Sequence, residues 1–458
     1  MMPTRARPTP PAATWVPTGP ALLPPLALTA MWFGAALALL LWWQDTQYVS
    51  GLDGWLTNAG RLTGLLAGYL LALLLALMAR VPALERGIGT DRLARWHASL
   101  GRYTVCLSVT HALLILWGYS LTAHVNPVSQ TSTLLLSYPD VLMATVALGL
   151  LVLVGVVSAR AARRRMSYET WHFIHLYTYL AVALAFSHQF ATGVDFVDNA
   201  PARWLWSAMY LSVALTLVWF RFLTPLLVAR RHQMRVVAVH RESADTVSVW
   251  IGGRQLDRLK AESGQFFRWR FLTRERWWAA NPYSLSAVPR PDLLRITVKD
   301  LGDHSRDLGT ISPGTRVLAE GPFGAFTARN ASGRGKVLLL AGGVGITPIR
   351  ALFESLPAAP GALTLIYRAS APQDVVFAEE LQHIAAGRQA RLLYLFGPRG
   401  SAGRPDPLQA DNLLRTIPDL AEHEVYLCGP PGMTDAAQRE LRRAGVGRRH
   451  VHVESFTF

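Results

Sequence analysis

Four histidines lie in two apolar stretches of the sequence, at spacings that could hold metal groups. His97 and His111 are fourteen residues apart in RWHASLGRYTVCLSVTHALLILW, and His175 and His188 are thirteen apart in WHFIHLYTYLAVALAFSHQF. An α-helix rises about 1.5 Å per residue, so each spacing corresponds to roughly 20 Å along a helix. Histidine is costly inside a bilayer and is usually functional there. Imidazole pairs from neighbouring helices at two levels are the ligands that two bis-histidine haems need.

A single histidine inside a membrane would equally well make a hydrogen bond between packed helices. The ordered set of four favours ligation, with one feature that does not fit. Thirteen residues turn an ideal helix by roughly 220° beyond whole turns, so His175 and His188 face different ways unless the helix is tilted or irregular. His172 does not face the same side of an ideal helix as His188 either. We therefore predict His175 as the inner ligand and keep His172 as the alternative.

Two arginines near these helices could pair with anionic haem propionates. Arg102 lies in the inner half of the third apolar stretch, and Arg61 lies at the outer end of the second. Arg61 could instead contact an electron acceptor. Each arginine could also simply extend its charged end to the membrane surface.

The composition divides the chain into an apolar half and an ordinary soluble half. The 458 residues are 51% hydrophobic and 16% charged, but long apolar runs occur only between residue 21 and about residue 225. A helix needs about 20 apolar residues to span the hydrocarbon core of a bilayer. Six segments are long enough: 21–43, 58–79, 96–118, 139–158, 169–190 and 203–225.

Arginine occurs in every second connection between these segments. The net charge is +15, and the connections at 44–57, 119–138 and 191–202 contain no Lys or Arg. Basic residues concentrate in cytoplasmic loops, so the pattern predicts a multi-pass protein of the inner (plasma) membrane with both termini cytoplasmic. It explains the charge better than nucleic-acid binding does. The Pro-rich residues 1–20 are expected to be disordered, and the first apolar run is interpreted as a retained helix.

The periodicity of the sequence changes after residue 232. Short alternating runs with turn residues between them predict an antiparallel β-barrel over residues 233–328. Strands then alternate with helical stretches over residues 333–458, which predicts a parallel sheet with helices on both faces. The expected fold class is therefore multi-domain: a six-helix transmembrane bundle over residues 21–228, an antiparallel β-barrel flavin domain and an α/β parallel-sheet nucleotide-binding domain.

The flavin assignment depends on three runs, NPYSLSA, ITVKDLGDHS and GPFGAF, whose spacing is typical of a flavin-binding barrel. Tyr283 would offer an aromatic face to the flavin ring, and Ser284 a hydroxyl donor. Lys299 and Ser305 could contact the phosphates. The alternative is a plain barrel with a tyrosine at its surface.

A glycine-rich turn, AGGVGITP, follows the predicted strand KVLLL. Gly342, Gly343 and Gly345 permit a tight turn and close approach of the backbone to a ligand. Thr347 suits the N-cap and Pro348 the first position of the next helix. A helix N-terminus favours a pyrophosphate, although the run is not the G-x-G-x-x-G fingerprint.

Three further features of the C-terminal half point to a nicotinamide nucleotide. Cys428, Gly429 and Pro430 form a second turn at a strand end, where nucleotides bind in open α/β sheets. Arg368 follows another strand and suits a ribose 2′-phosphate, which favours NADPH but leaves NADH possible. The terminal Phe458 could cover the flavin ring until the nicotinamide displaces it, or could simply anchor the C-terminus.

Taken together, these residues resemble the ferric reductase and NADPH oxidase superfamily, particularly its compact bacterial members, over about residues 25–458. The resemblance implies a six-helix di-haem domain followed by a ferredoxin–NADP reductase-type module. It implies that Tyr283 and Ser284 contact FAD, and that the turns at 342–348 and 428–430 bind the nicotinamide nucleotide.

Two positions depart from the family pattern. Asn281 stands where members often have His or Arg. Ile115 stands where eukaryotic superoxide-producing members commonly have a histidine, which weakens an oxygen-reducing role.

The expected function is electron transfer across the lipid bilayer. Cytoplasmic NADPH would reduce FAD, and single electrons would pass to an inner b-type haem held by His97 and His175. They would continue to an outer b-type haem held by His111 and His188, and then to oxygen, giving superoxide, or to ferric complexes. The alternatives are a flavin reductase with a passive membrane anchor and a transporter with a regulatory nucleotide-binding domain. Protein partners and oligomeric state are not predicted.

Overall fold

The computed structural model describes residues 23–44, 46–163, 165–166, 168–197, 199–274, 279–300, 307–397 and 406–455. The expected disordered tail, residues 1–20, lies outside them. The chain divides into two compact units. The helical unit comprises residues 22–81 and 91–222, and the second unit comprises mainly residues 223–458, with residues 82–90.

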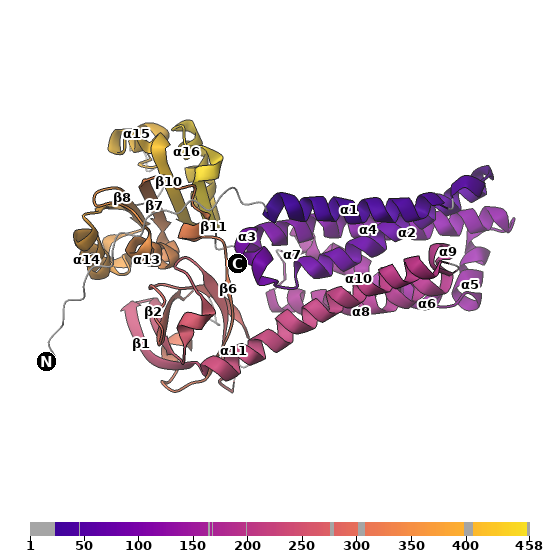
Figure 1. Cartoon of the computed structure of the whole chain (residues 1–458), viewed down its shortest axis with the longest axis horizontal. Helices are drawn as coiled ribbons and strands as arrows, with labels where there is room; N and C mark the ends of the chain where they lie inside the picture. Colours follow the sequence, from indigo (N-terminus) through magenta and orange to yellow (C-terminus); the bar gives the residue numbers. More distant parts are fainter. Residues whose placement is uncertain are drawn as a thin grey trace. The chain divides into compact units, whose positions relative to one another are not determined.

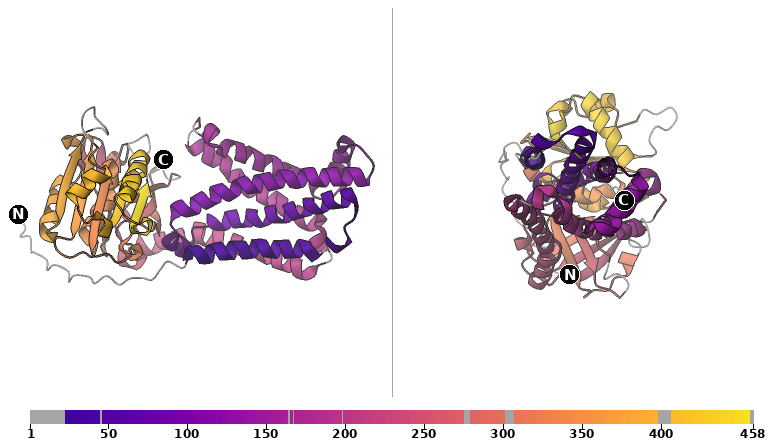
Figure 2. Two further views of the ribbon diagram at one scale, coloured as in Figure 1. Left: turned by 90° about the horizontal axis from the view of Figure 1, so that it is seen from above. Right: turned by 90° about the vertical axis from the view of Figure 1, so that its right-hand side faces the viewer.

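The helical unit consists of long helices that run side by side, drawn from indigo to magenta in Figures 1 and 2. The long helices are α1 (Leu23–Gln44), α2 (Gly51–Leu77), α4 (Thr90–Thr122), α6 (Val141–Ser158), α8 (Tyr168–Thr192) and α10 (Ala200–Val218). Shorter helices are α5 (Pro127–Ser137), α7 (Arg160–Arg163) and α9 (Val194–Val197). A π-helical turn, Trp219–Leu223, continues α10 into α11 (Thr224–His232).

A helix stands at each of the six expected positions, but only part of the six-span prediction is confirmed. Among the described residues, five helices are long and apolar enough to cross a membrane: α1, α2, α4, α6 and the continuous run Ala200–His232. α8 is 25 residues long and is not among them. Its three histidines and its tyrosines make it less apolar, so the sixth span remains a prediction.

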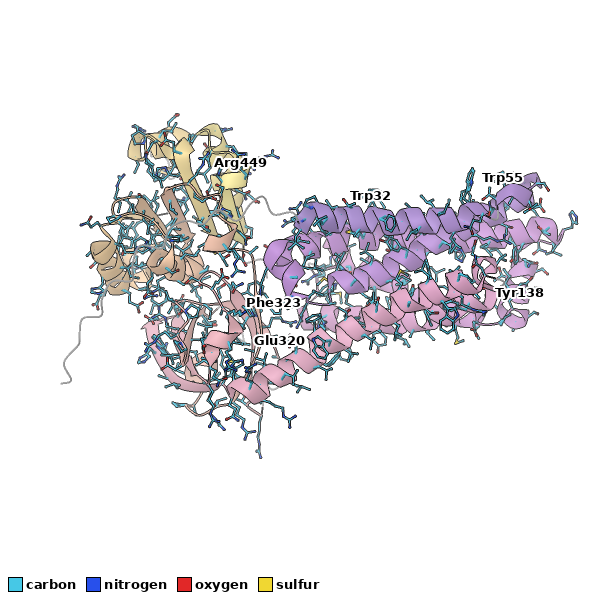
Figure 3. The ribbon with its side chains drawn as sticks, viewed as in Figure 1. Trp32, Trp55, Tyr138, Glu320, Phe323 and Arg449 are labelled. Carbon is cyan, nitrogen blue, oxygen red and sulfur yellow. The ribbon has the colours of Figure 1, made fainter. Side chains whose placement is uncertain are left out.

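The helices pack on one another through a core that α2, α6, α8 and α10 share. The Tyr210 hydroxyl donates a hydrogen bond to the Gly68 carbonyl over 2.7 Å, and Trp206 Nε1 donates to Gln189 Oε1 over 2.7 Å. The outer surface carries large apolar side chains such as Trp32, which is 75% exposed and projects from α1 (Figure 3). An apolar surface of this kind is suited to contact with lipid.

The first half of the second unit contains two three-stranded antiparallel sheets around one core. One sheet has the order β1 (Arg235–Ser243), β2 (Thr246–Gly252), β5 (Leu293–Lys299), and the other β4 (Asn281–Ser284), β3 (Phe266–Phe271), β6 (Val317–Phe323). Phe267 and Trp269 are fully buried between them. Only isolated bridges, Arg235 to Arg316 and Leu285 to Ile296, join the two sheets in the part of the chain described. The sheets confirm the antiparallel prediction, whereas a closed barrel is not shown.

The second half contains the predicted parallel sheet, in the order β11-β10-β7-β8-β9 with all neighbours parallel. Its strands are β7 (Lys336–Gly342), β8 (Leu363–Ala369), β9 (Arg391–Phe396), β10 (His423–Gly429) and β11 (Val451–Ser455). Its helices are α13 (Ile346–Ser355), α14 (Ala378–Arg388), α15 (Ala410–Thr416) and α16 (Pro431–Arg443). One core cluster includes α13 and α14, and another includes α15 and α16, so helices cover both faces as predicted.

Short elements complete the second unit. The helix α3 spans Pro82–Gly87. The 3-10 turns are Leu256–Leu259, Asp307–Thr310, Ala328–Asn330, Gly343–Gly345, Pro372–Asp374, Leu420–Glu422 and Arg448–His450, and the helical unit has one more at Thr46–Tyr48.

The turns that follow β7 and β10 touch through their backbones. A Cβ atom on Gly345 would overlap the Cys428 carbonyl oxygen and lie 2.7 Å from the Gly429 nitrogen, and one on Gly429 would lie 3.3 Å from the Gly342 Cα. Gly343 has a φ of +54°, which glycine adopts without strain. The order of the strands reverses at β7 and β10, which is where open α/β sheets bind ligands. The glycines therefore bring two turns together at the expected binding edge.

We predict that Gly345→Ala destabilises the protein by about 1–3 kcal/mol, because backbone atoms of β10 must move to accept the methyl group. Gly387→Ala in α14 is the matched control, since no atom lies within 4 Å of its added Cβ. The control should be neutral or stabilising by up to about 1 kcal/mol. Thermal unfolding of the detergent-solubilised chain measures both variants. Equal melting temperatures for the two would contradict the close approach of the turns.

Candidate functional site

The four histidines of the helical unit form two pairs between α4 and α8. The ring centroids of His97 and His175 are 5.9 Å apart, and those of His111 and His188 are 6.4 Å apart. The pairs form despite the thirteen-residue spacing on α8, so the expected misfit in rotation does not separate them. Trp171 contacts both candidate rings: its centroid lies 5.0 Å from that of His175 and 6.4 Å from that of its neighbour His172, and of the two His175 also pairs with His97. The geometry thus favours His175 over His172 as the partner of His97.

Backbone carbonyl groups of α2 orient both histidines of α4. His97 Nδ1 lies 3.1 Å from the Leu74 carbonyl oxygen, and His111 Nδ1 lies 2.7 Å from the Gly60 carbonyl oxygen. A carbonyl oxygen only accepts hydrogen bonds, so Nδ1 must carry the proton in each ring. The lone pair of Nε2 is then free, which is the tautomer of a histidine that binds metal through Nε2.

The two histidines of α8 differ in their hydrogen bonds. His188 Nδ1 lies 3.2 Å from the Thr192 hydroxyl, which itself donates to the His188 carbonyl oxygen over 3.1 Å. The hydroxyl has one proton, so it accepts from Nδ1 in this arrangement. His175 Nδ1 is buried and has no hydrogen-bond partner within the described residues. A buried polar atom without a partner is rare and is often explained by a missing ligand or ion.

The chain around the pairs fits haem ligation. A Cβ on Gly64 would lie 2.7 Å from His111 Nδ1, so the helices can approach as they do only with glycine there. The described residues contain no group of three or more His, Cys, Asp or Glu that could hold a metal ion. A porphyrin supplies four of the iron ligands, so two imidazoles suffice for each haem. Paired rings with free Nε2 atoms therefore suit a haem better than a protein-only metal site.

The predicted propionate partners are placed differently from each other. Arg102 is exposed on α4, whereas Arg61 is half-buried on α2. Arg61 directly follows Gly60, whose carbonyl group contacts His111. Arg102 follows His97 on α4, and Arg61 follows a residue that contacts His111, so each arginine is close in the chain to one histidine pair.

A cleft lies between the antiparallel sheets and the parallel sheet of the second unit. Residues from β2 and β5 line one side, and the other side is lined by the turn after β7, the start of α13, the end of β8 and the loop after β8. The lining residues are Thr246, Thr297, Lys299, Gly343, Val344, Ile346, Thr347, Ala369, Ser370, Asp374 and Val376. The cleft thus contains three predicted site residues, Lys299, Gly343 and Thr347. Lys299 Nζ pairs there with Asp245 Oδ2 over 3.0 Å.

The predicted helix start after β7 is wrong by two residues. The N-cap of α13 is Gly345, so Thr347 and Pro348 lie inside the first turn. The positive φ of Gly343 lets a 3-10 turn wind residues 343–345 before the helix begins. Thr347 Oγ1 consequently donates to the Val344 carbonyl over 3.0 Å instead of capping the helix.

The second predicted turn lies beside the first. β10 ends at Gly429, and Pro430 is the N-cap of α16. Cys428 is fully buried, and its carbonyl group lies against Gly345, so its thiol is not available at the turn. Arg368, the predicted 2′-phosphate contact, is paired: Nη1 lies 3.4 Å from Asp406 Oδ1, and Nη2 lies 3.4 Å from the Gly397 carbonyl oxygen.

Two of the predicted flavin contacts, Tyr283 and Ser284, lie on β4. Tyr283 is half-buried, and its carbonyl oxygen accepts a 3.0 Å hydrogen bond from Trp269 Nε1. Ser284 is 4% exposed. Ser305 and Phe458 lie outside the described residues.

Sequence reasoning missed several residues of this site. Thr246 and Thr297 line the cleft from β2 and β5, and Ser370 and Asp374 line it just beyond β8. Ser370 and Asp374 follow directly on a strand of the parallel sheet, in a loop of the kind that often carries function. The two threonines sit within strands and carry no comparable signal.

Comparisons with known proteins match both parts of the chain. Residues 63–186 match the family described as ferric reductase like transmembrane component, and residues 339–439 match the oxidoreductase NAD-binding domain. The carbazole 1,9a-dioxygenase ferredoxin reductase structure has a TM-score of 0.41 at 24% identity, covering 49% of this chain and 69% of that chain.

Two curated relatives each match less than half of the chain. The ferredoxin reductase component of 3-ketosteroid-9-alpha-monooxygenase from Mycolicibacterium smegmatis is 33% identical over 44% of this chain and 57% of its own length. Ferredoxin–NADP reductase B of Sorangium cellulosum is 35% identical over 38% of this chain and 77% of its own length. The chain spans 57% to 64% of the first three relatives. The chain therefore belongs to the NAD(P)H-dependent oxidoreductases of ferric reductase/NADPH oxidase-like architecture, in which a ferric reductase-like transmembrane component precedes a ferredoxin–NADP reductase-type module.

Proposed function

We propose that the protein transfers electrons from cytoplasmic NADPH, through FAD and two b-type haems, to an acceptor on the other side of the membrane. The observation that carries this proposal is the pairing of histidine rings between α4 and α8 at two levels, with the α4 rings oriented by carbonyl groups of α2. His97 and His175 would hold the inner haem, and His111 and His188 the outer haem.

The bound cofactors would supply the redox chemistry: FAD can take a hydride from NADPH and give up single electrons, and haem iron can carry them. Two imidazoles per iron leave no open coordination position. The acceptor would therefore be reduced without binding to the metal. Arg102 and Arg61 would offer positive charge to the haem propionates, and Arg61 could contact the acceptor instead.

The second unit would bind the nicotinamide nucleotide and the flavin. The backbone of the Gly342–Gly345 turn and the N-terminus of α13 would face the pyrophosphate, with Cys428, Gly429 and Pro430 beside it. Arg368 would bind the 2′-phosphate of NADPH after releasing its contact with Asp406. NADH remains the alternative nucleotide. A second set of contacts would hold FAD: Tyr283, Ser284, Lys299, Ser305 and, over the ring, Phe458.

The placement in the inner membrane is also part of the proposal. The arginine-rich connections would face the cytoplasm, so the C-terminal module that follows α11 would lie there too. Its substrate NADPH is a cytoplasmic reductant, which is consistent with that orientation.

Two other functions predict a membrane half without haem. A flavin reductase with a passive anchor and a transporter with a regulatory nucleotide domain would both leave the four histidines unexplained. A transporter also typically has broken helices near the middle of the membrane. A haem Soret band with bis-histidine α and β bands after dithionite reduction would exclude both.

We predict that Ala at His97 or His175 removes one of two haems, because each ring supplies half of the protein ligation. His172→Ala is the matched control on the same helix and should retain both haems. Pyridine haemochrome analysis gives haem per polypeptide, and NADPH–dye activity should survive in every variant. Full haem content in His175→Ala, or loss in His172→Ala, would overturn the assignment of the inner ligand.

We predict that ferric-chelate reduction exceeds superoxide release. Ile115 is packed so closely against α2 that a Cβ atom on Gly60 would lie only 2.8 Å from its Cδ1. Its side chain offers no hydrogen-bond donor to oxygen beside the outer histidine pair. Both products are measured with the purified protein and NADPH, with superoxide dismutase as the control for indirect iron reduction. Superoxide as the main product would show that oxygen is the acceptor.

A further inference from the structure

A buried arginine joins the two halves of the oxidoreductase module. Arg295 lies on β5 and is 2% exposed. Its Nη1 donates to Glu380 Oε1 over 2.7 Å, and its Nη2 donates to Glu380 Oε2 over 3.0 Å. Two parallel hydrogen bonds of this kind restrict both distance and orientation. Glu380 belongs to α14, so the pair connects the antiparallel sheets with the nucleotide-binding half.

A second arginine completes the connection. Arg350 lies on α13, is 8% exposed, and donates from Nε to Glu380 Oε2 over 2.7 Å. Burial raises the pKa of the Glu380 carboxyl, but the hydrogen bonds and charges of Arg295 and Arg350 outweigh burial and hold this pKa below its usual value. The carboxylate therefore stays charged at neutral pH. We call Arg295, Glu380 and Arg350 the ion triad.

The ion triad is connected to the flavin side of the cleft through Ser286, which lies two residues beyond Ser284. Arg295 Nε donates to Ser286 Oγ over 3.1 Å, and Nη2 donates to its carbonyl oxygen over 2.8 Å. Ser286 Oγ also accepts from Thr297, which lines the cleft, over 2.7 Å. The guanidinium carbon lies 5.1 Å from the Trp250 ring centroid and 4.7 Å from that of Phe377.

The ion triad reaches the nucleotide side of the cleft as well. α13 follows directly on the Gly343–Gly345 turn, and Val376, two residues before α14, lines the cleft. One carboxylate thus ties β5 on one wall to two helices that position the other wall. Its removal would allow the walls to shift relative to each other.

Stability alone is a poor explanation for the ion triad. Arg295 and Arg350 are buried, whereas the side chain of Glu380 is 37% exposed. Taking charges out of water costs about as much as their attraction returns, and well-packed apolar residues often replace a buried pair without loss. Hydride transfer, in contrast, requires reacting atoms about 3–3.5 Å apart in the correct orientation, and a misplacement of about 1 Å can cost a hundredfold in rate. Fixed geometry is what a bidentate pair provides.

We propose that the ion triad is a positioning device for hydride transfer: it sets the separation between the flavin-side and nucleotide-side walls of the cleft. Arg295, Glu380 and Arg350 act through the groups they hold and do not touch the reacting atoms. The inference rests on the NADPH-to-flavin half of the proposed function and is independent of the haem assignment.

The test compares full-length variants in detergent. Glu380→Gln keeps the shape of the side chain but removes its charge. We expect NADPH–ferricyanide turnover per flavin to fall tenfold to a hundredfold. The deuterium isotope effect from 4-deuterated NADPH should rise, while the NADP+ dissociation constant from calorimetry changes less than twofold. The long-wavelength charge-transfer absorbance of reduced protein with NADP+ should weaken.

Two further variants separate positioning from stability. Glu354→Gln removes the other carboxylate that contacts Arg350, within α13 alone, and should leave all four readouts unchanged. Arg295→Met combined with Glu380→Met replaces the buried charge of Arg295 and the charge of Glu380, whose side chain is 37% exposed, with apolar groups and leaves Arg350 paired with Glu354; it should retain the melting temperature but remain slow. Restored turnover in this double variant, or unchanged turnover in Glu380→Gln, would overturn the proposal. A wild-type protein without flavin or NADPH–dye activity would instead refute the proposed function.

Discussion

The arrangement of the helical unit depends on hydrogen bonds from histidine rings to the backbone of α2. A polar ring within a helix bundle needs a partner, and α2 supplies one at each of two positions fourteen residues apart, Gly60 and Leu74. His97 and His111 are separated by the same number of residues on α4. Two helices running together with matched spacing can satisfy both rings in the same way. The carbonyl groups thereby fix the tautomer and leave Nε2 of each ring without a proton, and each ring also lies beside a histidine ring of α8.

Glycine makes these backbone contacts possible in both units. Gly60 and Gly64 let α2 approach α4, since a methyl group at either position would press on Ile115 or His111. In the second unit, Gly342 and Gly345 let the turn after β7 touch the turn after β10 in the same manner. In the helical unit the backbone of α2 approaches side chains of α4, and in the second unit the turn after β7 approaches the turn after β10. The positions of glycine are as informative about the sites as those of the histidines.

Local patterns predicted much of this arrangement, and contacts between distant segments explain the rest. Histidine spacing predicted the pairs, and strand–helix alternation predicted the parallel sheet. The start of α13 was misplaced, because the backbone freedom of Gly343 outweighed the capping preference of Thr347. Arg295 gave no signal, because an arginine in a strand is normally exposed and its partner Glu380 lies 85 residues away. The expected sixth span is not among the apolar helices for a related reason, since the histidines that mark the candidate site also lower the apolar character of α8.

The two histidine levels are not equivalent. At the level of His111 and His188, both Nδ1 atoms have an oxygen acceptor, from Gly60 and Thr192. At the other level, His97 has one and His175 has none among the described residues. A hydrogen bond accepted from Nδ1–H increases the basicity of a ligating imidazole and restricts its rotation. Under the proposed haem assignment, the His111–His188 pair would therefore be the more strongly donating and the more rigid of the two, whereas the His175 ring is positioned by the Trp171 ring, whose centroid is 5.0 Å away, and not by an oxygen acceptor in the part of the chain that the structure describes.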